Sequence, residues 1–184
     1  MPRIQPLTQE TASDAAKPLL DGVKKKMGVV PNLLGTLAHS PAALNSYLSQ
    51  SNSLADASLS AGVREQIALT IAGENSCGYC ASAHTMIAKG AGVDDAEAAS
   101  SLRGESSDPK IQAALTFAAA INEKRGWIDD ADFEAVRNAG YSDGEILEIL
   151  ATVSLNIYTN YANHLASTVN DFPAVELPTA QAAS

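Results

Sequence analysis

Two cysteines and a histidine lie close together in ENSCGYCASAHTMIAKG, residues 74–90. Cys77 and Cys80, the only two cysteines of the chain, are separated by two residues, and His84 follows four residues after Cys80. On an α-helix these intervals place the three side chains on one face. A helix N-terminus and a nearby imidazole favour a thiolate, the form that attacks peroxides and disulfides. The spacing leaves three interpretations open: a redox couple, part of a metal site, or small apolar residues packed in a helix.

A carboxylate that could control protonation precedes this group. Glu65 lies in LSAGVREQIALTIAG, where an apolar stripe predicts a helix that begins after the N-cap Ser60 and ends near Gly73. Asn75 or Ser76 is expected to cap the helix that follows. Glu65 can reach the cysteines and the histidine only if these two helices pack as a hairpin across a short turn.

The hydrophobic periodicity predicts an all-α fold, with no convincing strand alternation. Further helices are expected over 18–27, 31–39, 41–56, 93–102, 109–124, 129–140 and 142–169, with Gly28 as the stop of the first. The segments outside them lack periodicity. We therefore predict a flexible N-terminal segment over 1–17, a single all-helical domain over 18–173 and a flexible tail over 174–184.

A second Glu–His pair suggests an internal repeat. His84 follows Glu65 by nineteen residues, and His164 follows Glu145 by the same interval, but the second copy has no cysteines. The match fits an internally duplicated helical unit and fits chance equally well. In the repeat interpretation the last helix brings His164, with its neighbouring asparagines, to a pocket rim or a subunit interface. Otherwise His164 is a polar helix-end residue.

Composition limits the partners of the chain. The formal charge of −9 argues against nucleic acid and anionic membranes, because both need a basic face. Hydrophobic residues make up 46% of the 184 residues and aromatic residues only 5%, which is typical of closely packed Ala-rich helices. Neither a signal peptide nor a membrane span is apparent, so we expect a cytoplasmic protein.

The spacing of Glu65, Cys77-Gly78-Tyr79-Cys80 and His84 resembles the core signature of a known family. This is the alkylhydroperoxidase D branch of the carboxymuconolactone decarboxylase family. Segments 28–44 and 156–173 are similar to the entry segment and the last helix of its peroxidase-related subgroup. The resemblance extends over roughly residues 18 to 175.

That resemblance implies an AhpD-like multi-helical bundle, a homo-oligomer (trimer or hexamer), and reduction of hydroperoxides reset by an external thiol or dithiol, with no cofactor or metal. Carried over by position, Cys80 is the peroxidatic thiol, Cys77 the resolving thiol, His84 the proton relay and Glu65 its carboxylate. Tyr79 departs from the pattern, since many members have histidine there. A phenol donates a hydrogen bond but does not shuttle protons at neutral pH. Tyr79 and His164 are therefore accessory candidates.

Three alternatives to a peroxidase remain. One is lactone decarboxylation, as the family name suggests, although relatives with that activity lack the cysteine couple. Another is a zinc site with Cys77, Cys80, His84 and Glu65 as ligands, which adjacent helical positions make geometrically tight. The last is a redox-sensing or structural oligomer whose disulfide forms without turnover.

Overall fold

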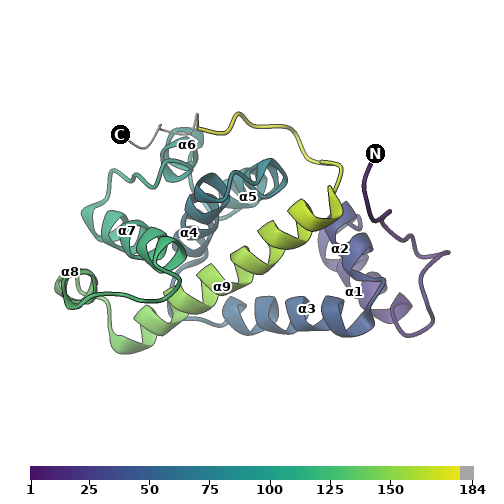
Figure 1. The fold of residues 1–184 in the computed structure, drawn as a ribbon, viewed down its shortest axis with the longest axis horizontal. Helices are drawn as coiled ribbons and strands as arrows, with labels where there is room; N and C mark the ends of the chain where they lie inside the picture. Colours follow the sequence, from purple (N-terminus) through teal and green to yellow (C-terminus); the bar gives the residue numbers. More distant parts are fainter. Residues whose placement is uncertain (179–184) are drawn as a thin grey trace.

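A computed structural model describes residues 1–178. Within them the chain is all-α, as predicted, with nine helices and no strand (Figure 1). The helices are α1 (Lys17–Met27), α2 (Asn32–Leu37), α3 (Pro41–Ala55), α4 (Ala61–Glu74), α5 (Gly78–Gly90), α6 (Asp95–Ser101), α7 (Pro109–Glu123), α8 (Asp130–Asn138) and α9 (Asp143–Ala166).

Local signals in the sequence account for most helix boundaries. The side chains of Ser40, Ser60 and Ser142 each accept a backbone N–H of the helix that they begin, which satisfies one of its unpaired donors. Gly28 ends α1 with φ of 81°, a left-handed conformation that glycine adopts without steric cost.

Helix α4 lies at the centre of the fold and contacts α5, α6, α7 and α9. Its residues 66–72 are buried on every side, so the single apolar stripe predicted for this helix is too narrow. The helix ends at Glu74, next to the predicted end near Gly73. A Cβ at Gly73 would overlap the carbonyl oxygen of Leu102, so Gly73 also allows the end of α6 to pack directly against the α4 backbone.

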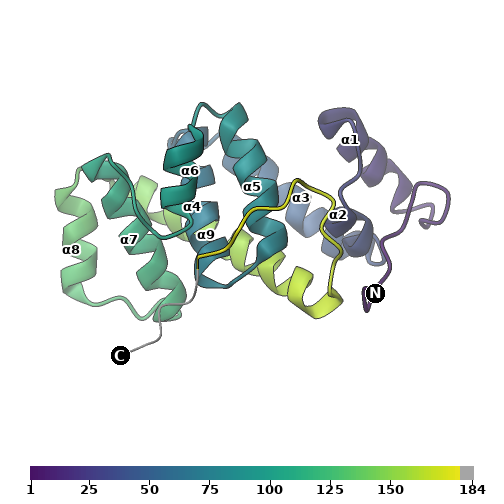
Figure 2. The same cartoon turned by 90° about the horizontal axis from the view of Figure 1, so that it is seen from above.

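Helix α9 is the longest and runs diagonally across the molecule from α8 towards α2 (Figures 1 and 2). Glu145 lies in its first turn, in a capping box with Ser142, and His164 lies in its last turn. Glu65 and His84 instead lie on two successive helices. The interval of nineteen residues is therefore not a repeated structural unit, because it spans a helical hairpin in one place and one continuous helix in the other.

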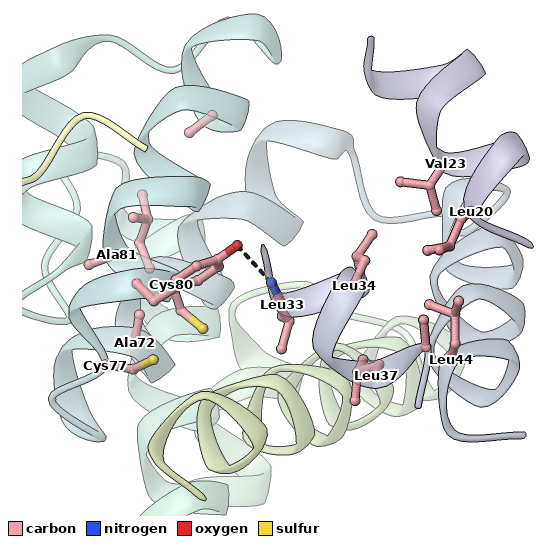
Figure 3. Packing of buried hydrophobic residues seen from close by; sticks show 14 of the residues in the cluster. Leu20, Val23, Leu33, Leu34, Leu37, Leu44, Ala72, Cys77, Cys80 and Ala81 are labelled. Carbon is pink, nitrogen blue, oxygen red and sulfur yellow. Dashed lines mark hydrogen bonds between the residues drawn. The ribbon is translucent and has the colours of Figure 1, made fainter. Parts of the chain in front are cut away.

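Two hydrophobic clusters form the core. One joins α4 to α7, α8 and the first half of α9. The other joins α1, α2 and α3 to α5 and contains both cysteines (Figure 3). The cysteines are therefore part of the packed interior rather than of a surface loop. None of the helices in residues 1–178 has the length and apolar character that crossing a bilayer requires.

The irregular ends of the chain lie against the helices. The backbone N–H of Arg3 donates to the Ala166 carbonyl at 2.7 Å, and that of Leu7 donates to the Gly35 carbonyl at 3.0 Å. The segment over 1–17, expected to be flexible, is thus hydrogen-bonded to α2 and the end of α9. In the expected tail, the N–H of Val175 lies 3.4 Å from Ser82 Oγ on α5, and residues 179–184 lie outside the described part.

Candidate active site

The turn between α4 and α5 sets the position of Cys77. Ser76 has φ of 53°, and its N–H donates to the Gly73 carbonyl at 3.0 Å, while the Cys77 N–H donates to the Ala72 carbonyl at 2.8 Å. This pair of bonds is a Schellman motif, which ends α4. Neither Asn75 nor Ser76 therefore caps α5, contrary to prediction. Cys77 itself is the N-cap residue, next to the free N–H groups of the first turn.

Both thiols are free and buried. Cys77 is 1% exposed and Cys80 2%, and their sulfur atoms project from the start of α5 to the same side (Figure 3). Helix α9 covers them: Asn163 Nδ2 donates to Cys80 Sγ at 3.2 Å, and Thr159 Oγ1 lies 3.9 Å from the same sulfur. The amide and the hydroxyl hold Cys80 in a single orientation at the base of the site.

Ionisation of the two thiols is linked because each hydrogen-bonds the other. The Cys80 side chain, its backbone amide and His164 together outweigh burial and lower the pKa of Cys77 to about 6. The hydrogen bond to Cys77, burial and the Cys77 charge raise the pKa of Cys80. The pair therefore carries one negative charge near neutral pH, mainly on Cys77, and resists a second ionisation.

This linkage predicts the pH dependence of thiolate formation. The ultraviolet thiolate absorbance of the reduced protein should rise with a midpoint near the pKa of about 6 of Cys77, because the pair is neutral below it and singly charged above it. His164→Gln should move the midpoint to higher pH, since His164 is one of the groups that lower the pKa of Cys77. His39→Gln is the control, because His39 Nε2 lies 2.9 Å from the Gln5 carbonyl, away from the cysteines. An unchanged midpoint in H164Q would contradict the role of His164.

His84 and Glu65 form the predicted ion pair across the helical hairpin. His84 Nδ1 lies 2.7 Å from Glu65 Oε2, and each side chain is 19% exposed. Burial disfavours the charged imidazole, but Glu65, the Cys77 charge and the Asn156 side chain outweigh it and raise the pKa of His84. A raised pKa keeps a proton on His84 nearer to neutral pH, where it can be donated.

Two adjoining cavities give access to these groups. The larger, of about 650 Å³, lies between α1, α3, α4, α5 and α9 and is lined by both Glu65 and His84. The smaller, of about 50 Å³, is lined by His84 and Cys80 and shares Tyr47 with the larger one. Cys77 lines neither. Cys80 is thus the thiol that a molecule entering from the larger cavity would meet.

Tyr79, the departure from the family pattern, holds two segments together. The backbone N–H of Leu33 donates to its hydroxyl at 3.1 Å, and its ring meets that of Phe172 edge to face at 5.5 Å. Burial is the main cause that raises the pKa of the phenol, so it stays protonated at neutral pH. Tyr79 therefore anchors α5 to α2 and to the C-terminal segment instead of exchanging protons with the thiols.

The family match confirms the sequence-based assignment. Residues 39–123 match the model of the carboxymuconolactone decarboxylase family. An uncharacterized peroxidase-related protein from Ralstonia eutropha JMP134, described as an alkylhydroperoxidase AhpD core, superposes with a TM-score of 0.84 and 25% identity over 92% of each chain. A peroxidase-related protein from Silicibacter sp. TM1040 superposes with a TM-score of 0.78 and 26% identity over 86% of each chain. Residues 39–123 are thus similar to the carboxymuconolactone decarboxylase family, and the fold is that of AhpD-like peroxidase-related proteins.

The similarity to a further solved structure concerns the fold alone. The debrominase Bmp8, solved alone and in complex with 2,3,4-tribromopyrrole, superposes with a TM-score of 0.77 and 21% identity over 91% of each chain. None of the curated proteins is similar in sequence to the chain. Solved structures of similar fold thus include a debrominase as well as peroxidase-related proteins.

The matched family segment contains Glu65 and the thiols but ends before α9. Thr159 and Asn156 were not among the candidates predicted from the sequence. Helix α9 brings Thr159 to Cys80 and Asn156 to His84. A usable signal was present in α9, where four buried polar residues recur every three or four positions: Thr152, Asn156, Thr159 and Asn163. A polar stripe on the buried side of a helix indicates a polar site within the core.

The positions of the four candidate zinc ligands do not fit a zinc site. Among residues 1–178, no group of three or more His, Cys, Asp or Glu side chains is arranged to hold a metal ion. Glu65 and His84 hydrogen-bond each other, while Cys80 bonds with α9. The four side chains form two separate pairs, a dithiol and a carboxylate–imidazole pair, rather than one tetrahedral set.

Proposed function

We propose that the protein is a thiol-dependent oxidoreductase that reduces hydroperoxides through a Cys77–Cys80 dithiol/disulfide couple. One observation carries the proposal: two free cysteines share a charge at the start of α5, and one of them lines a cavity together with a paired histidine. The peroxidase-related proteins of similar structure support the same reaction class.

In the proposed reaction the Cys80 sulfur attacks the terminal oxygen of the hydroperoxide. A proton moves from Cys80 to Cys77 across their hydrogen bond, an S–O bond forms and the O–O bond breaks. The leaving alkoxide takes a proton and departs as the alcohol, which leaves Cys80 as a sulfenic acid. The Cys77 sulfur then attacks the Cys80 sulfur as it gives up the proton that it received, the S–O bond breaks, and the departing hydroxide takes that proton and leaves as water. An external thiol or dithiol returns two electrons and two protons.

His84 and Glu65 have the role of proton control in this scheme. His84 lines the same small cavity as Cys80, and its raised pKa suits donation of a proton to the leaving oxygen. Glu65 stabilises the imidazolium before transfer and orients the ring through Nδ1. With Nδ1 bound to Glu65, the other ring nitrogen is available for the cavity.

The test is a peroxide assay coupled to a dithiol donor. Reduced protein treated with cumene hydroperoxide should lose both free thiols and the mass of two hydrogens per chain. With dithiothreitol present it should consume many equivalents of peroxide. Oxidation that stops after one equivalent, although the donor reduces the disulfide, would contradict the enzyme and favour a redox sensor. Absence of any thiol loss would leave the family's lyase chemistry as the alternative.

The 2,3,4-tribromopyrrole bound to Bmp8 supplies a comparison oxidant for the same assay. Reductive debromination would convert the dithiol to the disulfide and release bromide, with hydrogen replacing bromine on the ring. If bromide were released faster than peroxide is reduced, a brominated pyrrole would replace the hydroperoxide as the proposed substrate.

The proposal includes a homo-oligomer, trimer or hexamer. Four large apolar side chains of α9 are exposed. Such a group on one helix indicates an interaction surface rather than isolated surface hydrophobic residues. The four side chains are Leu147 at 64%, Leu150 at 43%, Tyr161 at 59% and Leu165 at 64%. A solution mass equal to one chain would contradict this part.

A further inference from the structure

The larger cavity is far bigger than hydrogen peroxide needs. Its volume of about 650 Å³ lies within the range of about 300–1,000 Å³ typical of sites for small organic molecules. Much of its wall is aliphatic, including Leu19 and Val23 of α1, Leu48 of α3 and Ile87 of α5. In Figure 2, α1 stands apart from α4 and α5.

Two cations line the cavity. They are Lys26 of α1, whose Nζ donates to Asn52 Oδ1 of α3 at 3.3 Å, and Arg64 of α4, whose Nη1 donates to the Leu59 carbonyl. Within residues 1–178 neither cation has an acidic partner. Of the described residues, Glu65 is the only carboxylate in the lining, and it is paired with His84. Two cations without counter-ions at the wall of an apolar cavity favour an anionic group of a ligand.

The larger cavity extends along α3. Tyr47, in the middle of α3, lines both the larger cavity and the small cavity that Cys80 lines. Asn52, which accepts the hydrogen bond from Lys26, lines the larger cavity further along α3. Met27, which follows Lys26, also lines both cavities, so a ligand held by Lys26 can extend from the larger cavity towards Cys80.

The length of this wall fits an alkyl chain. From Tyr47 to Ala55 the rise along α3 is about 12 Å, which an extended chain of roughly ten carbon atoms spans at C–C bonds of about 1.5 Å. An apolar chain can therefore lie along α3, next to the small cavity that His84 and Cys80 line. We propose that the substrates are amphipathic hydroperoxides that carry a carboxylate, held by Lys26 and Arg64 while the apolar chain fills the cavity. This inference rests on the proposed function for its reacting group.

The experiment measures ligand binding separately from activity. Decanoate is titrated into the reduced protein by calorimetry, with methyl decanoate as the uncharged comparison. We expect decanoate to bind, and expect K26M/R64M to weaken it by at least about tenfold, as loss of charge-assisted hydrogen bonds requires. Lys26→Met alone should give a smaller loss. K25M/R125M is the matched control, because it removes the same charge from α1 and from an exposed turn without touching the cavity.

The outcomes separate the two proposals. No decanoate binding, equal binding of the ester, or equal losses in K26M/R64M and K25M/R125M would overturn the inference. If cumene hydroperoxide is still reduced in that case, the proposed function stands without it. If decanoate binds as expected but no hydroperoxide is reduced, the cavity keeps its ligand class and the proposed function fails. A lower KM for linoleic acid hydroperoxide than for its methyl ester, lost in K26M/R64M, would support both.

Discussion

Cys80→Ser should lower kcat/KM for hydroperoxide by at least about 10³-fold, in line with removal of a nucleophile from other enzymes. The serine hydroxyl can still accept the hydrogen bond from Asn163 Nδ2, so the buried site keeps its packing. The donor-coupled assay measures the loss, and thermal unfolding checks that the variant is folded.

The two thiols differ in a way that makes this prediction sharp. Cys77 has the lower pKa, which favours it as the nucleophile, but Cys80 lines the cavity and Cys77 does not. We expect access to decide, because a proton passes readily between two hydrogen-bonded sulfurs, whereas a sulfur that lines no cavity cannot meet the peroxide. The cost of moving the charge is also recovered when Cys77 becomes the thiolate that resolves the sulfenic acid.

Cys77→Ser should behave differently from Cys80→Ser. Without Cys77, the largest cause that raises the pKa of Cys80 is removed, so Cys80 should still react once with peroxide. The resulting sulfenic acid has no second cysteine with which to form a disulfide, so dimedone should trap it. The variant should not turn over through a disulfide. If dimedone instead labels Cys77 in Cys80→Ser, and Cys77→Ser is inert, the two roles are reversed.

Gly73→Ala should destabilise the fold by about 3 kcal/mol or more, at the upper end of the usual cost of overpacking. The added methyl would meet the backbone carbonyl of Leu102, which cannot rotate away as a side chain can. Relief requires α6 to move off α4, next to the buried contact of Thr70 Oγ1 with the Ser101 carbonyl at 2.9 Å. Urea unfolding followed by circular dichroism measures the change.

Gly22→Ala is the matched control on another helix. No atom lies within 4 Å of a Cβ at Gly22, which is inside α1. Alanine should therefore stabilise the protein by about 0.5–1 kcal/mol through helix propensity alone. A loss of similar size in both variants would show that the close approach at Gly73 is not the cause.

Much of the fold could be predicted because its signals are local. Ser40, Ser60 and Gly28 mark helix boundaries by hydrogen bonds and conformations that involve only neighbouring residues. The prediction failed at the start of α5, where Cys77 rather than Asn75 or Ser76 is the cap, because Ser76 belongs to the turn that ends α4. The close approach of α6 to Gly73 likewise has no local signal, because it depends on a distant segment.

The candidate site likewise combines features that the sequence predicts with features that depend on packing between distant helices. The sequence was sufficient for the dithiol and for the pairing of Glu65 with His84, because a helical hairpin with a short turn leaves these residues few alternative positions. The rest depends on α9, which contacts α5 across some eighty residues of chain and supplies Asn163 and Thr159 to Cys80. Which sulfur is charged, which one faces the cavity and what that cavity holds follow from packing between distant helices, and no local spacing encodes such packing.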